Sequence, residues 1–143
     1  MLTPMRSPQL LGDLAGLALP VAPEAAQCGF PSPAQDYPTD ELNLAELLIR
    51  DRPATYFWRA AGHSMEPVIP DGSLLIVDRG VTPVPGRIVV AVVDGEYTVK
   101  RLHVDDSGQV TLGAENSAYP DIALPELSEM TIWGTVTFII SPA

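Results

Sequence analysis

Positive charge is scarce in this chain. Of its 143 residues, 8 are Lys or Arg and 18 are Asp or Glu, so the formal net charge is -10. Proteins that bind nucleic acid directly need clustered Lys and Arg to contact phosphates. We therefore expect no direct nucleic-acid binding, and any role on DNA would have to pass through protein partners.

Cysteine and histidine are almost absent as well. Cys28 is the single cysteine, and His63 and His103 are the two histidines. A chain with one cysteine forms no internal disulfide, and three such side chains cannot complete a thiolate-rich zinc site with four ligands. We expect neither a metal nor a cofactor.

Long apolar runs are also missing. No stretch approaches the roughly 18 apolar residues of a membrane-spanning helix. Arg6, the apolar stretch from Leu10 to Leu19 and Cys28 have the outline of a secretory signal, but Asp13 interrupts the apolar stretch and Gln27 stands where a small residue is usual. The sequence favours a cytoplasmic protein without a membrane segment.

Proline is abundant and unevenly placed. Seven of the 15 prolines lie within residues 1–38, which show little periodicity. We predict a flexible N-terminal arm over 1–38 and one domain over 39–143. The apolar pattern from Leu42 to Ile49 predicts a short helix, capped by Thr39 or Asp40 and ended before Pro53.

The remainder of the chain has the pattern of β-structure. Asp94-Gly95 lies between two apolar segments and is a strong signal for a two-residue hairpin turn. The predicted strands are 55–58, 73–77, 87–93, 96–102, 109–112 and 132–140. The fold class is therefore mostly β, with one short helix.

Lys100 is the only lysine, and it stands in a strand-like segment. A lysine differs from an arginine in that burial can remove its proton. Ser64 lies in a polar turn, Gly62-His63-Ser64-Met65. A serine beside a neutral lysine forms a hydrolytic dyad, in which the amine accepts the hydroxyl proton.

Such a dyad requires apolar surroundings that exclude water from the lysine amine. Val99, Leu102 and the valine-rich neighbouring strand could lower the pKa of Lys100 by desolvation. Thr98 shares a strand face with Lys100, and we expect it to orient the amine. The backbone N–H of Ser64 would face the oxyanion that forms during catalysis.

Simpler interpretations remain open for each of these residues. Most serines in such turns are solvated, and a lysine on an edge strand often deters aggregation. His63 could instead pair with Ser64, although adjacent side chains usually point apart. His103 is interpreted as a surface residue.

Several segments together resemble the UmuD proteins and, more broadly, the LexA-type self-cleaving serine peptidases. The resemblance covers residues 27–140 and is carried by segments 28–34, 44–50, 54–57, 62–65, 71–78, 91–100 and 116–119. It implies that Ser64 is the nucleophile, that Lys100 is the general base, and that the cleaved bond joins Cys28 and Gly29. It also implies a strongly bent β-sheet peptidase domain of the LexA C-terminal type.

The resemblance further implies partners. The family forms homodimers, for which 132–140 would be a natural edge strand. Its cleavage is stimulated by the RecA filament on single-stranded DNA, and the shortened product assists a UmuC-type translesion polymerase in the SOS response. The first 28 residues are too short and Pro-rich for a helix-turn-helix, so we do not expect a repressor. The alternative is a non-catalytic β-fold module that binds RecA or a polymerase.

Overall fold

A computed structural model describes residues 9–10, 18–22, 26, 28–29, 40–123 and 130–143. Contacts divide the chain into two units, one comprising Met1–Leu11 with Asp51–Ala143 and the other Gly12–Arg50. Each unit is treated by itself. The domain boundary expected between residues 38 and 39 stays a prediction.

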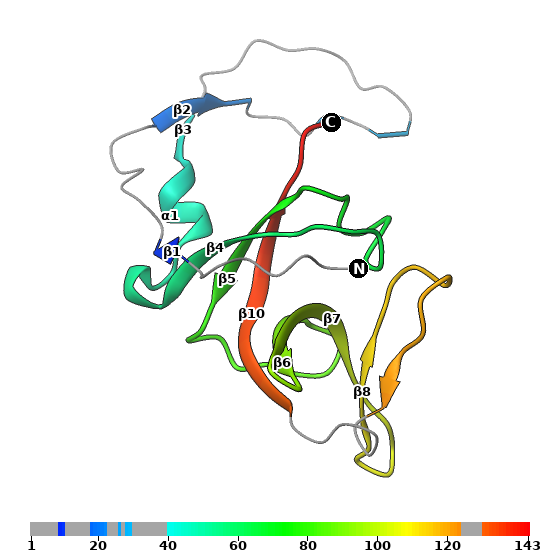
Figure 1. Cartoon of the computed structure of the whole chain (residues 1–143). Helices are drawn as coiled ribbons and strands as arrows, with labels where there is room; N and C mark the ends of the chain where they lie inside the picture. Colours follow the sequence, from blue (N-terminus) through cyan, green and yellow to red (C-terminus); the bar gives the residue numbers. More distant parts are fainter. Residues whose placement is uncertain (1–8, 11–17, 23–25, 27, 30–39, 124–129) are drawn as a thin grey trace. The chain divides into compact units, whose positions relative to one another are not determined.

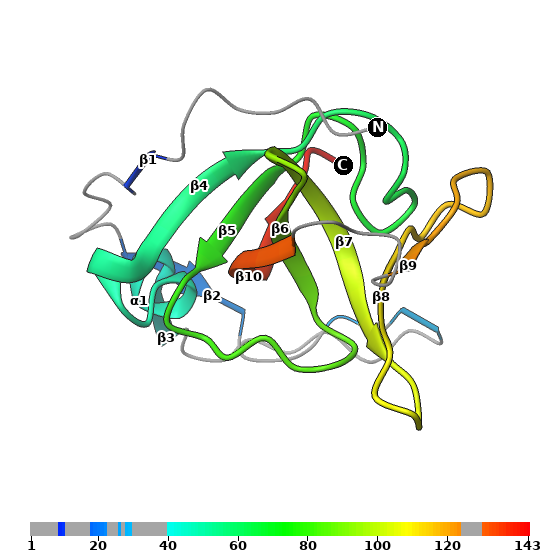
Figure 2. The ribbon, with the colours of Figure 1, turned by 60° about the horizontal axis from the view of Figure 1, so that its bottom comes forward.

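The larger unit is built on one eight-stranded sheet. Its strand order is β1-β4-β5-β10-β6-β7-β8-β9, and every pairing is antiparallel. Figure 2 shows β4, β5, β10, β6 and β7 following one another across the sheet. The bounds are Gln9–Leu10 (β1), Thr55–Arg59 (β4), Leu74–Asp78 (β5), Ile88–Val93 (β6), Glu96–Val104 (β7), Val110–Gly113 (β8), Ile122–Ala123 (β9) and Met130–Ile140 (β10). The prediction of a mostly-β fold with one short helix is confirmed.

The hairpin of β6 and β7 provides the frame for Lys100. Its turn is Asp94-Gly95, with φ angles of 48° and 82°. Positive φ at both central residues is what a tight two-residue hairpin turn requires. The turn sets the register in which Lys100 lies opposite Val89.

Both faces of β6 are buried, which explains its unbroken apolar sequence. Ile88 and Val90 belong to one core cluster, together with Trp58. Val89 and Ala91 belong to a second cluster, with Leu112. The strands that hold Lys100 are therefore packed from two sides.

Strand β10 is paired along its length, first with β6 and then with β5. Met130 to Thr135 pair with β6 and Thr135 to Ile140 pair with β5, and Figure 1 shows β10 between these two strands. Its register shifts between Ile132 and Gly134 against β6, and between Val136 and Phe138 against β5. Among the described residues each half of β10 therefore has one partner strand, and the dimer edge expected at 132–140 stays a prediction.

The smaller unit contains a two-stranded sheet, β2 (Ala18–Val21) with β3 (Asp40–Asn43), and helix α1 (Leu44–Leu48). The predicted helix is real but begins later than expected. Asn43 caps it, accepting hydrogen bonds from the N–H groups of Ala45 and Glu46 at 3.0 and 3.4 Å. Leu42 pairs with Leu19 across the sheet and so is held in a strand.

A 3-10 turn follows at Arg52–Ala54 and leads into β4. No helix in the described part of the chain is long and apolar enough to cross a membrane.

Close packing inside the sheet leaves no room for a side chain at Gly134. A Cβ at this position would lie 2.7 Å from Cγ1 of Val77, whose side chain is 0 % exposed. We predict that Gly134→Ala lowers the free energy of unfolding by about 1–3 kcal/mol, as overpacking does. Urea unfolding of the purified protein measures this.

The double variant Val77→Ala/Gly134→Ala is the control. Removing the Val77 methyl groups makes room for the new one, so Gly134→Ala should cost much less in that background. An equal cost in both backgrounds would show that the contact with Val77 is not the reason.

Candidate active site

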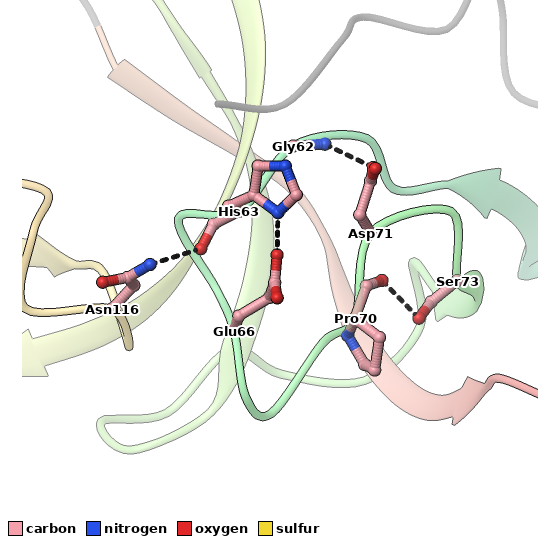
Figure 3. A network of polar contacts seen from close by, with 7 residues as sticks. All are labelled: Gly62, His63, Glu66, Pro70, Asp71, Ser73 and Asn116. Atoms are coloured by element: carbon pink, nitrogen blue, oxygen red, sulfur yellow. Dashed lines mark hydrogen bonds and ion pairs between the residues drawn. The ribbon is translucent and has the colours of Figure 1, made fainter. Parts of the chain in front are cut away.

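Ser64 lies in an irregular loop, residues 60–73, which connects β4 to β5 and is called the serine loop below. Its ends are closed by two backbone hydrogen bonds, Ala60 N–H to Ser73 O and Gly72 N–H to Ala60 O, both 2.9 Å long. Figure 3 shows a further bond from the Gly62 N–H to Oδ1 of Asp71, 2.7 Å long. These bonds hold a loop without regular structure in a defined shape, and Ser64 within it is only 5 % exposed.

Lys100 reaches Ser64 from the middle of β7. Its Nζ lies 3.0 Å from Oγ of Ser64 in a buried contact. The second partner of Nζ is the carbonyl oxygen of Val99, at 3.2 Å. The structure thus brings together two residues that lie 36 positions apart in the sequence.

Burial lowers the pKa of the Lys100 amine below its ordinary value, because desolvation penalises the ammonium form. The side chain is 7 % exposed and lies opposite Val89, which is fully buried. Neither of the ion pairs His63–Glu66 and Arg101–Glu115 includes this amine. Its hydrogen-bond partners, Ser64 and the Val99 carbonyl, are uncharged.

A small, largely apolar hollow opens beside Ser64. It is lined by Ala60, Ala61 and Gly62 before the serine, Met65 and Ile69 after it, and Val99 beside the lysine. These residues are the ones that a group bound next to the hydroxyl would contact.

The other candidates from the sequence lie elsewhere. The ring of His63 contacts the Glu66 carboxylate, not Ser64, and its side chain is 60 % exposed. The Ser64–His63 pairing is therefore wrong. The expectation that Thr98 orients the amine is also wrong, because Nζ is held by Ser64 and the Val99 carbonyl.

Cys28 and Gly29 belong to the smaller unit. Both are exposed, and Cys28 is a free thiol. Residues 27 and 30–39, which flank them, lie outside the described residues. The cleavage bond expected between Cys28 and Gly29 stays a prediction.

Asn116 was missed as a site residue, although its segment contributed to the family resemblance. Its side chain donates a hydrogen bond to the carbonyl of His63 at 3.0 Å, as Figure 3 shows. Its backbone N–H donates to the carbonyl of Ser64, also at 3.0 Å. An asparagine in a loop indicates only local turn chemistry, so this long-range contact could not be predicted from the residues around Asn116.

The chain is similar to known proteins over most of its length. A family model described as Peptidase S24-like matches residues 20–137. Protein SamA from Salmonella typhimurium is 43% identical over 122 residues, which span 85% of this chain and 84% of SamA. Protein MucA from Escherichia coli is 43% identical over 122 residues, spanning 84% of this chain and 82% of MucA.

A more distant relative is LexA repressor 1 from Geobacter sulfurreducens. It is 34% identical over 128 residues, which span 88% of this chain and 62% of the repressor. Together these matches confirm the family resemblance predicted from the sequence.

The pKa of Lys100 can be measured directly, because this is the only lysine and labelled lysine gives one side-chain NMR signal. We predict a titration below the ordinary pKa of about 10.4. The unfolded chain then binds more protons than the folded one between the two pKa values. Stability should therefore rise with pH through that window.

Lys100→Met is the matched control. It keeps an unbranched side chain without charge, so its free energy of unfolding should lack this pH dependence. A Lys100 signal that titrates at the ordinary pKa, or an unchanged pH dependence in the Met variant, would contradict the desolvated site.

Proposed function

Because the chain belongs to the Peptidase S24-like family, we propose that it is a self-processing serine peptidase that uses Ser64 and Lys100. The contact of 3.0 Å between Lys100 Nζ and Ser64 Oγ is the observation that carries this proposal. Burial that favours the neutral amine supports the role of Lys100 as general base. The enzyme would act chiefly on the bond between Cys28 and Gly29 of its own arm.

The proposed reaction proceeds through an acyl-enzyme. As Oγ of Ser64 attacks the carbonyl carbon of Cys28, its proton passes to neutral Lys100. The tetrahedral intermediate collapses, the C–N bond to Gly29 breaks, and Lys100 returns the proton to the departing amine. Lys100 then takes a proton from a water molecule as that water attacks the ester carbon. The bond between this carbon and Oγ breaks, Lys100 returns the proton to Oγ, and Cys28 leaves as a new carboxyl terminus.

The Ser64 backbone is suited to stabilising the oxyanion. Within the described residues its N–H donates no hydrogen bond, so it is free to bind the negative oxygen. One such donor is worth roughly 3 kcal/mol in known hydrolases.

The choice of bond rests on the chemistry of the arm. Gly29 has no side chain, and among the described residues no atom lies within 4 Å of the position that a Cβ would occupy, its chain neighbours left aside. A small residue followed by glycine can enter a narrow cleft in extended form without steric conflict. The small hollow beside Ser64 supports a small side chain, such as that of Cys28, before the bond.

The biological setting is proposed from the family. We infer that cleavage is stimulated by the RecA filament on single-stranded DNA, and that the product, as a homodimer in the cytoplasm, assists a UmuC-type translesion polymerase. The net charge of -10 supports protein partners over direct contact with nucleic acid.

Self-cleavage tests the proposal. Purified protein should yield a species with the mass of residues 29–143 when it is incubated with RecA, single-stranded DNA and a nucleotide, and separately at alkaline pH. Ser64→Ala should abolish this product. Lys100→Arg, which keeps the charge but holds its proton, should slow it by at least about 10²-fold.

Ser117→Ala, at an exposed serine, is the control and should cleave normally. A product that persists in Ser64→Ala would remove the serine from the mechanism. A wild-type chain that stays intact in both conditions would favour the non-catalytic binding module.

A further inference from the structure

The loop between β8 and β9, residues 114–121, is attached to the serine loop. The N–H of Asn116 donates to the carbonyl of Ser64 at 3.0 Å. Its side-chain Nδ2 donates to the carbonyl of His63 at the same distance. One residue thus holds two consecutive carbonyls around the serine.

The Asn116 side chain is itself fixed. Its Oδ1 accepts a hydrogen bond from the N–H of Ala118, and its carbonyl accepts one from Tyr119, both 3.0 Å long. Oδ1 of Asp121 accepts from the N–H of Ala114 at 3.2 Å and closes the loop. Both ends of the Asn116 amide are therefore used. Oδ1 accepts a hydrogen bond inside the loop, and Nδ2 donates one to the serine loop.

The same loop is tied to the strand that carries Lys100. Glu115, adjacent to Asn116, forms an ion pair with Arg101, adjacent to Lys100. Nη1 of Arg101 also donates to the carbonyl of Gly86 at 2.6 Å. Two neighbouring residues of one loop therefore contact the two elements that meet at the Ser64–Lys100 contact.

The two partners differ in how firmly they are held. Lys100 lies on a strand paired on both sides, whereas Ser64 lies in a loop without regular structure. The other backbone bonds near Ser64, Glu66 N–H to His63 O and Ile69 N–H to Met65 O, stay within the loop. Met65 and Ile69 of the loop pack in the same core cluster as Val99, and the hydrogen bonds from Asn116 add a restraint from outside the loop at the serine itself.

We propose that Asn116 is a positioning residue that sets the distance between Ser64 Oγ and Lys100 Nζ. Its role in cleavage rests on the proposed function, but its effect on geometry does not. A misplacement of 1 Å can slow an enzymatic reaction by about 10². The ion pair Glu115–Arg101 fixes the loop relative to β7, and Asn116 fixes the serine relative to the loop.

Asn116→Asp tests the role with little change in shape. The aspartate keeps the acceptor for Ala118 but loses the donor to His63. The assay is run well below the melting temperature of each variant. We expect alkaline self-cleavage of the full chain to be about 10- to 100-fold slower in Asn116→Asp than in the wild type. Ser117→Ala, next to it and exposed, should cleave at the wild-type rate. Cleavage of Asn116→Asp within twofold of wild type would overturn the proposal.

A second readout does not need activity. The single Lys100 NMR signal is compared with and without Asn116→Ala, in both the Ser64 and the Ser64→Ala backgrounds. If Asn116 acts through the serine, the substitution shifts the signal when Ser64 is present and much less when it is absent. A merely structural role gives equal shifts, or none, in both backgrounds and overturns the proposal.

The two readouts separate this inference from the proposed function. A wild-type chain that does not cleave, but whose Lys100 signal responds to Asn116 only through Ser64, rejects the peptidase and keeps the positioning role. A wild-type chain that cleaves, together with an Asn116→Asp variant that cleaves as fast, keeps the peptidase and rejects the positioning role. If Asn116→Ala does not fold, Asn116→Asp and Glu115→Gln carry the NMR comparison.

Discussion

The structure depends on one buried contact, between an amine and a hydroxyl. Water would stabilise the ammonium form of Lys100. The site excludes water from the amine, because the side chain is 7 % exposed and lies opposite the fully buried Val89. The hydrogen-bond partners of the amine, Ser64 and the Val99 carbonyl, carry no charge. The fold thus favours a neutral amine beside Ser64, the state in which lysine can accept a proton.

Holding that contact is the task of the surrounding sheet. The β6–β7 hairpin places Lys100 in a strand packed on both sides, while the serine loop leaves and rejoins the sheet between β4 and β5. A strand gives a precise position, and the serine loop brings the Ser64 hydroxyl to the amine beside a small hollow. Asn116 connects these two requirements, because its loop contacts the serine and, through Glu115, the strand of the lysine.

Much of this was predictable from local pattern. Asp94-Gly95 predicted the hairpin because both turn residues must adopt positive φ, and a lone lysine in an apolar strand predicted the partner of Ser64. The errors arose where distant contacts decide. The segment before Asn43 became a strand by pairing with β2. The contact of Asn116 with the serine loop left no local signal.

The central claim is that Lys100 must lose its proton before Ser64 can attack, and one comparison tests it directly. The rate of alkaline self-cleavage of the wild-type chain is measured against pH, and the pKa of Lys100 is measured by NMR in the intact Ser64→Ala variant. The account predicts that the rate rises with pH and levels off with an inflection near the Lys100 pKa. A rate independent of pH, or an inflection far from that pKa, would contradict it.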